Sequence, residues 1–172
     1  MRLYSTNSPN QFVSLQEAVL RGLPPDNGLY MPRELPPLPE TFWQTAPELS
    51  FPQLAVRVCD HLLSDAIPSK VLRPLVEKAI NFEAPLIRLD EHRAILELFH
   101  GPTLAFKDFG ARFMAGLMGH FVEKEEQDLH ILVATSGDTG GAVASGFWQT
   151  PGIQVIILYP SGKVSALQEK QL

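Results

Sequence analysis

The sequence predicts an α/β fold in which a mainly helical amino-terminal region precedes βαβ units of a parallel sheet. Two apolar runs, residues 129–134 and 153–158, have the length of strands, and a helical stretch over 140–148 lies between them. Glycine-containing turns bound these runs, and the order strand, turn, helix, strand is typical of parallel units with right-handed crossovers. Before residue 82, apolar residues recur every three or four positions, which indicates helices.

The amino-terminal region begins with a predicted short helix and a turn. Ser14 and Glu17 have the spacing of a capping box, so a helix is expected to start there and to end near Gly22. The pair Asn27–Gly28 favours a turn, because both residue types adopt positive φ easily. Prolines recur between residues 32 and 52, which predicts extended chain that lies on a core without regular structure.

Two longer helices are expected next, over residues 51–63 and 71–80, from the register of their leucines and valines. Between residues 82 and 88 the pattern changes from helical to strand-like. We therefore predict a domain over residues 1–85 and the start of an α/β domain over residues 86–172.

Composition bounds the class of protein. The chain has 172 residues, 45% of them hydrophobic, and a net charge of −5 with no basic block, which argues against nucleic acid or an anionic membrane surface as a partner. No apolar run has the length of a membrane span and the amino terminus has no signal-peptide core, so we expect a cytoplasmic protein. The single cysteine, Cys59, and five scattered histidines predict neither a disulfide nor a metal site.

The segment around Lys107 is the first chemical candidate. Residues 94–99 are expected to form a buried strand that Gly101–Pro102 breaks, and a helix is expected to begin near Phe106. Lys107 therefore lies at a helix entrance. Large apolar residues continue along that helix at a spacing of three and four and predict a stripe packed on a core, namely Phe106, Phe109, Phe113, Leu117 and Phe121.

A lysine in this setting suits Schiff-base chemistry. An ammonium is no nucleophile, and the ordinary lysine pKa of about 10.4 leaves the amine protonated at neutral pH, so the chemistry needs desolvation or positive potential nearby. A helix start supplies positive potential. Asp108 opposes it if its carboxylate points at the amine. The alternative is that Lys107 only extends along an amphipathic helix to reach water.

A glycine turn at residues 135–141 is the second candidate. Gly137, Gly140 and Gly141 let backbone approach a ligand, free amides at the helix start favour an anion, and Ser136 and Thr139 add hydroxyl groups. The alternative is a plain strand-to-helix turn, which favours the same residues. Lys163 follows the next strand and is expected at the same sheet edge, where ligands of such sheets gather.

Two other phosphate motifs are excluded by spacing. The turn does not supply the Gly-x-Gly-x-x-Gly spacing of a dinucleotide fingerprint, since its glycines stand at positions 137, 140 and 141. Gly162-Lys163 is not a P-loop, since Ile157 stands where its first glycine would be and Val164 replaces the hydroxyl residue.

Two long motifs carry a family resemblance. The string ELFHGPTLAFKDF over residues 97–109 and ATSGDTGGA over 134–142 resemble threonine synthase, a pyridoxal-phosphate enzyme of the tryptophan-synthase-β fold type. The amino terminus is similar too, although Asn27 replaces the first glycine of the family's Asp-Gly-Gly-Leu-Tyr segment. The resemblance covers essentially the whole chain and implies an incomplete part of a fold type II enzyme.

The resemblance also implies roles for individual residues. Lys107 would carry pyridoxal 5'-phosphate as a Schiff base, flanked by Phe106, and Asp138 would stand where related enzymes place an asparagine at the cofactor's phenolic oxygen. A carboxylate there is repulsive unless one group is protonated, so the role of Asp138 stays open. The loop formed by Ser136, Gly137 and Thr139 would receive the substrate's anionic end, with Lys163 as a further contact to its phosphate.

The implied reaction converts O-phospho-L-homoserine and water to L-threonine and phosphate by γ-elimination and β-addition. Because the family is considerably longer and its phosphate-gripping glycine loop has no counterpart here, the chain alone is expected to bind the cofactor weakly and not to turn over. Two alternatives stay open. One is another lyase of the same fold, such as a serine or threonine dehydratase, and the other is a non-catalytic phosphate-sensing remnant.

Overall fold

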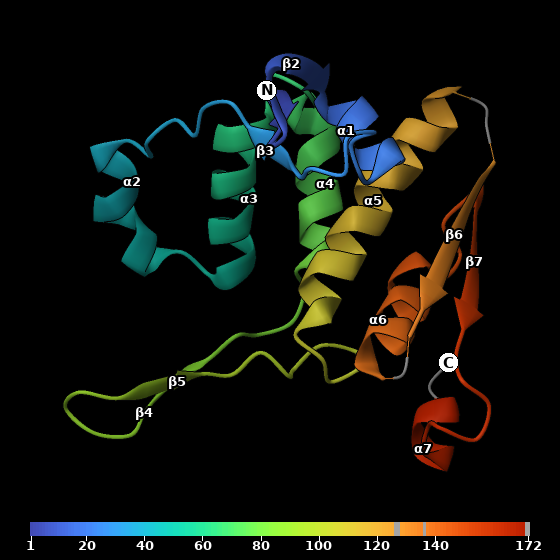
Figure 1. The fold of residues 1–172 in the computed structure, drawn as a ribbon. Coiled ribbons are helices and arrows are strands. Elements are labelled where there is room, and N and C mark those ends of the chain that lie inside the picture. The colour runs from blue at the N-terminus through green and yellow to red at the C-terminus, as the bar shows by residue number, and fades with distance from the viewer. Residues whose placement is uncertain (126–127, 136, 171–172) are drawn as a thin grey trace. The chain divides into compact units, whose positions relative to one another are not determined.

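The computed structural model describes residues 1–125, 128–135 and 137–170 (Figure 1). The chain divides after Glu77 into two compact units. This division falls a few residues before the predicted boundary between residues 85 and 86, so the proposed domain limits stay a prediction. Among the described residues, no helix combines the length and the apolar character that crossing a membrane requires.

The first unit opens with a small antiparallel sheet that the sequence did not predict. Strands β1 (Arg2–Ser5), β2 (Ser8–Ser14) and β3 (Tyr30–Pro32) are ordered β2-β1-β3. The sequence of β2 is rich in Ser, Asn and Pro and has little apolar alternation, and most of its residues are exposed. Backbone pairing rather than side-chain burial therefore defines this sheet, which is why a search for apolar periodicity misses it.

The predicted amino-terminal helix is confirmed as α1 (Leu15–Arg21). Ser14 Oγ accepts a hydrogen bond from the Glu17 amide at 3.1 Å, as expected of an N-cap. The second half of the predicted capping box is wrong, because the Glu17 carboxylate points along the helix and pairs with Arg21 at 3.0 Å. Gly22 ends the helix with a positive φ of 75°.

The turn after α1 is held by Asp26. Its carboxylate accepts hydrogen bonds from Ser5 Oγ at 2.6 Å, Ser8 Oγ at 2.5 Å and the Gly28 amide at 3.0 Å. Asn27 has φ of 60°, which explains why the family's glycine can be replaced by asparagine, the residue that best tolerates this region. A side chain at position 28 would lie 2.2 Å from Ser5 Oγ, so the glycine there is required.

The proline-rich stretch does contain regular structure, contrary to the prediction. Helix α2 (Glu40–Thr45) follows Pro39, and the 3-10 turn η1 (Ala46–Glu48) contains Pro47. Pro39 serves as an extended N-cap, so it starts the helix instead of breaking it. Phe42 is buried and anchors the helix.

Helices α3 (Phe51–Leu63) and α4 (Ser69–Ala79) agree closely with the predicted spans. The most deeply buried apolar side chains near them are Ile67, Leu72 and Val76. Asp60 of α3 pairs with Arg73 of α4 at 2.8 Å. Asp60 therefore joins α3 and α4.

The second unit begins with an exposed hairpin. Strands β4 (Leu86–Arg88) and β5 (Ala94–Leu96) pair antiparallel and extend away from the rest of the second unit (Figure 1). The expectation of a buried strand over 94–99 is wrong here, since every residue of β4 and β5 is exposed. An apolar run favours burial, but no described element of the second unit covers the side chains of this hairpin.

The βαβ unit is confirmed. Strands β6 (Leu129–Ala134) and β7 (Ile153–Leu158) run parallel in register from Leu129↔Ile153 to Ala134↔Leu158, and α6 (Asp138–Phe147) connects them. Helix α5 (Lys107–Glu125) precedes β6, and the short helix α7 (Ala166–Glu169) follows β7.

Helices α5 and α6 pack closely because one residue of the contact has no side chain. A Cβ at Gly146 of α6 would lie 3.0 Å from the Ala111 carbonyl carbon and 3.1 Å from the Arg112 nitrogen of α5. The predicted α5 stripe is buried at Leu117 and Phe121, half-buried at Phe109 and Phe113, and exposed at Phe106. The stripe prediction therefore holds except at its first residue.

Candidate active site

Lys107 is the first residue of α5. Its side chain is half-buried, and Nζ lies 4.7 Å from the centroid of the Phe106 ring, over which it sits. Phe106 itself is 60% exposed. The amine therefore stands at the positive, amino-terminal end of a long helix with one aromatic ring beside it.

The Asp108 carboxylate does not turn toward this amine. Oδ2 accepts a hydrogen bond from the Thr103 amide at 2.9 Å, and Oδ1 accepts one from Thr103 Oγ1 at 2.7 Å. Asp108 is completely buried. The open question about its direction is thus settled by a contact five residues back in the chain, which sequence periodicity does not reveal.

His100 lies at the start of the loop that leads into α5. Its Nε2 is 2.7 Å from Glu97 Oε2, and its ring stacks on Phe99 with centroids 4.7 Å apart. Both contacts lie within four residues, so His100 shapes the approach to the loop.

The glycine turn is organised by Thr135, a residue that the sequence motifs did not single out. Thr135 Oγ1 accepts hydrogen bonds from the Gly137 amide at 3.3 Å and the Gly140 amide at 3.1 Å. These two amides are therefore not free, contrary to expectation, and an anion would have to compete with Thr135 for them. The available signal was a hydroxyl residue just before a helix start, which is typical of capping.

The remaining predicted residues fall around this turn. Gly137 is the N-cap of α6, and Asp138 and Thr139 form its exposed first turn. Ser136 lies outside the described residues. Lys163 is exposed in the turn after β7, where its amide donates to the Pro160 carbonyl at 3.1 Å.

The parallel register brings the two turns to one sheet edge. Ala134 pairs with Leu158, and the Thr135 amide extends the ladder to the Leu158 carbonyl at 2.9 Å. The carboxyl ends of β6 and β7 and the amino-terminal ends of α5 and α6 lie toward the same, lower side of the unit in Figure 1. The candidate residues therefore share one end of the second unit.

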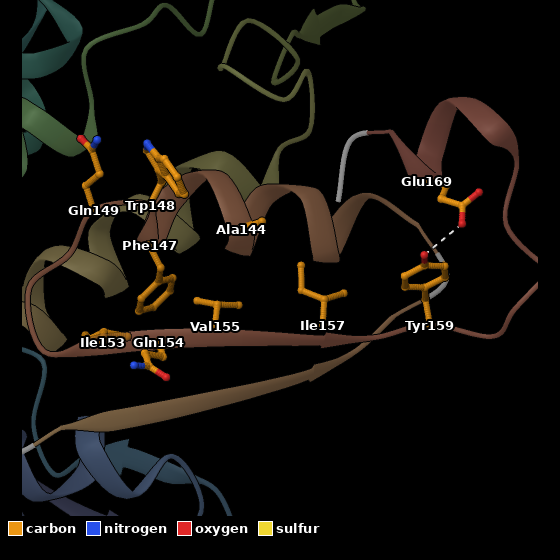
Figure 2. Close-up of a pocket in the computed structure, with 10 residues that line it drawn as sticks. All are labelled: Ala144, Phe147, Trp148, Gln149, Ile153, Gln154, Val155, Ile157, Tyr159 and Glu169. Atoms are coloured by element: carbon orange, nitrogen blue, oxygen red, sulfur yellow. Dashed lines mark hydrogen bonds between the residues drawn. The ribbon is translucent and has the colours of Figure 1, made fainter.

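A cavity of about 640 Å³ lies apart from these residues. Figure 2 shows Ile153, Val155 and Ile157 pointing from β7 toward α6, with the Tyr159–Glu169 hydrogen bond at one end. None of the predicted site residues that the structure describes lines it. The cavity is a gap between α6, β7 and α7. The candidate site lies elsewhere, at the carboxyl ends of β6 and β7.

The fold and this edge define the class of protein: an α/β protein that presents a lysine amine and a glycine turn where parallel strands end. A family model described as "Threonine synthase N terminus" matches residues 2–80. The chain is 43% identical to threonine synthase of Escherichia coli (strain K12) over 170 residues, which are 99% of this chain and 39% of that protein.

Solved structures agree. The crystal structure of threonine synthase from Escherichia coli aligns with a TM-score of 0.87 over 99% of this chain and 40% of its own. A threonine synthase from Brucella melitensis, described as PLP bound, aligns with a TM-score of 0.93 at 34% identity and is covered to 38%. Over nearly its whole length the chain is similar to threonine synthases. It spans about two fifths of the length of these relatives.

Proposed function

We propose that this chain supplies the lysine-bearing part of a threonine synthase, the enzyme that converts O-phospho-L-homoserine and water to L-threonine and phosphate. The observation that carries the proposal is the setting of Lys107. Its amine stands at the start of α5, while both oxygens of the adjacent Asp108 carboxylate are occupied by Thr103. The neighbouring carboxylate is thus directed to Thr103 and not to the amine.

The residues fit the aldehyde-bearing side of pyridoxal 5'-phosphate. That cofactor, when bound, supplies an aldehyde that condenses with an amine and a ring that stores an electron pair. Lys107 offers a primary amine, and the Phe106 ring offers an apolar wall beside it at 4.7 Å. We assign Lys107 as the cofactor-bearing residue, with Phe106 and Asp138 as further cofactor contacts.

The amine of Lys107 would also act as a general base on the substrate. In γ-elimination and β-addition, one proton leaves the α carbon and one leaves the β carbon, and protons are then delivered to the γ carbon and back to the α carbon before threonine departs. A lysine that alternates between amine and ammonium can move them. Gly137, Thr139 and Ser136 are proposed to hold the substrate's anionic end. Lys163, at the same sheet edge, is proposed to contact its phosphate.

We further propose that the isolated chain binds the cofactor weakly and has no turnover, and that it is an incomplete part of a fold type II enzyme. Supporting this is the fact that it spans about two fifths of the relatives' length. Incubating the isolated chain with O-phospho-L-homoserine and pyridoxal phosphate should release no phosphate above background. Sustained phosphate release would contradict the proposal.

The decisive experiment is reductive labelling. The chain is incubated with pyridoxal phosphate, reduced with borohydride, digested and analysed by mass spectrometry. Its six lysines compete within one molecule, so we expect the pyridoxyl adduct to concentrate on Lys107. The variant Lys107→Arg should lose this adduct, while the matched control Lys124→Arg, on the exposed end of the same helix, should keep it. Equal labelling of all lysines would refute the assignment.

A sibling reaction on the same fold is tested separately. The chain would be assembled with the remaining three fifths of the Escherichia coli relative, and two products would be followed. Phosphate from O-phospho-L-homoserine supports the proposal, whereas a keto acid formed from threonine would point to a dehydratase.

A further inference from the structure

Asp108 is an unusual residue for its place in the chain. Among the residues that the structure describes, it is the one charged side chain that is buried, with no exposed surface at all. A buried carboxylate is stable only if hydrogen bonds compensate for lost hydration. Thr103 supplies two such bonds, one from its amide and one from its hydroxyl.

These bonds close a loop directly before Lys107. The Leu104 amide donates to the Gly101 carbonyl at 3.0 Å, and the Asp108 amide donates to the Ala105 carbonyl at 3.0 Å. Leu104 has φ of 59°, a strained value for a residue with a branched side chain, and its side chain is 72% exposed. Packing of Leu104 therefore does not hold the loop in this shape.

Gly101 shows how tightly the carboxylate is seated. A Cβ at this position would lie 2.4 Å from Asp108 Oδ2 and 2.7 Å from its Cβ. The loop backbone thus passes directly over the Asp108 side chain. Gly101, Thr103 and Asp108 form a single unit, which we call the loop clamp.

We infer that Asp108 is a positioning residue that, through Thr103, fixes the loop from which Lys107 enters α5 and keeps its own carboxylate away from the Lys107 amine. The inference rests on the proposed function, because it assigns the clamp a purpose only if Lys107 is the reacting amine. It adds two residues, Asp108 and Thr103, that the motif assigns no role.

The physical argument has two parts. If Thr103 released the carboxylate, Oδ1 and Oδ2 would be left buried without partners, and the nearest cation along the chain is Lys107. An ion pair between them would hold the amine as an ammonium, which does not attack an aldehyde. Release would also let the Leu104 backbone relax from its positive φ, and the first turn of α5, which carries Lys107, would change its orientation.

Matched variants separate these effects. Thr103→Val keeps the shape but removes the hydroxyl bond, Thr103→Ser restores it, and Asp108→Asn keeps an acceptor for the amide and a donor for the hydroxyl while removing the charge. Asp90→Asn serves as the control, since Asp90 makes similar contacts to the His92 and Arg93 amides, both at 2.9 Å, in the exposed hairpin. Far-UV circular dichroism verifies that each variant is folded.

Two measurements are made on each variant. The first is the share of pyridoxyl adduct on Lys107 relative to the other lysines, and the second is hydrogen exchange in the peptide that covers residues 101–105. For Thr103→Val we expect the Lys107 share to fall and the exchange to speed up, each about tenfold, as the loss of one hydrogen bond to a buried charge predicts. Thr103→Ser, Asp108→Asn and the Asp90 control should stay within about threefold of the parent chain.

The outcomes are distinguishable. If the parent chain itself does not favour Lys107, the proposed function fails and this inference fails with it. If the parent favours Lys107 and Thr103→Val does so equally, only the inference is overturned, whether or not exchange accelerates, because the clamp would then be merely structural. A large loss in Asp108→Asn with Thr103→Val unaffected would also overturn it, since charge and not position would then matter.

Discussion

Replacing Arg112 with alanine should loosen the attachment of α5 to the segment before the hairpin. Arg112 Nε donates to the Ala79 carbonyl at 2.9 Å, and Nη2 donates to the Lys78 carbonyl at 2.5 Å and to Asn81 Oδ1 at 2.9 Å. The guanidinium also lies 5.7 Å from the centroid of the Phe82 ring. One side chain therefore caps the end of α4 and binds the chain that follows it.

The expected loss follows from these contacts. Three hydrogen bonds at a net value of about 1 kcal/mol each give about 3 kcal/mol, and exposure of the Lys78 and Asn81 contacts reduces this to about 2 kcal/mol. The contact with the Phe82 ring adds about 0.5 kcal/mol. We expect Arg112→Ala to lower the free energy of unfolding of the second unit by about 2.5 kcal/mol. Arg112→Lys should lose most of this, because an ammonium cannot reproduce the planar fork.

The assay is a urea titration followed by circular dichroism, with hydrogen exchange of the α5 peptide assigning the transition to the second unit. Arg93→Ala is the matched control, because the Arg93 side chain is 75% exposed and its ion pair with Asp90 should contribute at most about 0.5 kcal/mol. If Arg112→Ala is no less stable than this control, the reasoning about the cap is refuted.

Three further predictions concern other parts of the chain. Gly146→Ala should lower the melting temperature and destabilise by about 1–2 kcal/mol because its Cβ would push α5 and α6 apart, whereas Gly110→Ala, with no atom near its Cβ, should be neutral or stabilising. Hydrogen bonds from Ser5, then Ser8, lower the pKa of Asp26 below its ordinary 3.8. The stability that ionised Asp26 contributes is complete above pH 3.8 and is lost as pH falls through the lowered pKa. When the pH is lowered below 3.8, the midpoint urea concentration of the parent chain should therefore decrease, and that of Asp26→Asn should decrease less. Burial, and then Asp60, raise the pKa of Cys59 above its ordinary 9.0, so at pH 9 iodoacetamide should alkylate it more slowly in the folded chain than in urea, and equal rates would contradict this.

The sequence predicted the elements whose side chains carry their own pattern. The bounds of α3, β6 and β7 match the predicted ranges because apolar residues there recur with a clear period or form a bounded run. The sheet formed by β1, β2 and β3 was missed because its strands are defined by backbone pairing.

The candidate site divides in the same way. Lys107 could be found from sequence, because a lysine between a broken strand and an apolar helix is a local pattern. The bonds from Thr103 to Asp108 and from the Gly137 amide to Thr135 could not, because they depend on how irregular loops fold back on a helix start. A polar residue before a helix suggests a cap but does not say which atom it serves.

The two-stranded β6–β7 sheet has two open edges, and the backbone hydrogen-bonding groups along them pair with no further strand among the described residues. One face of the pair also presents Leu132, Ile156 and Leu158 to solvent, at 65%, 43% and 52% exposure. Such a ribbon is a template on which other extended chains can assemble. Purified alone, the polypeptide should be concentration-sensitive and prone to self-association, so labelling experiments belong at high dilution with light scattering as a companion measurement.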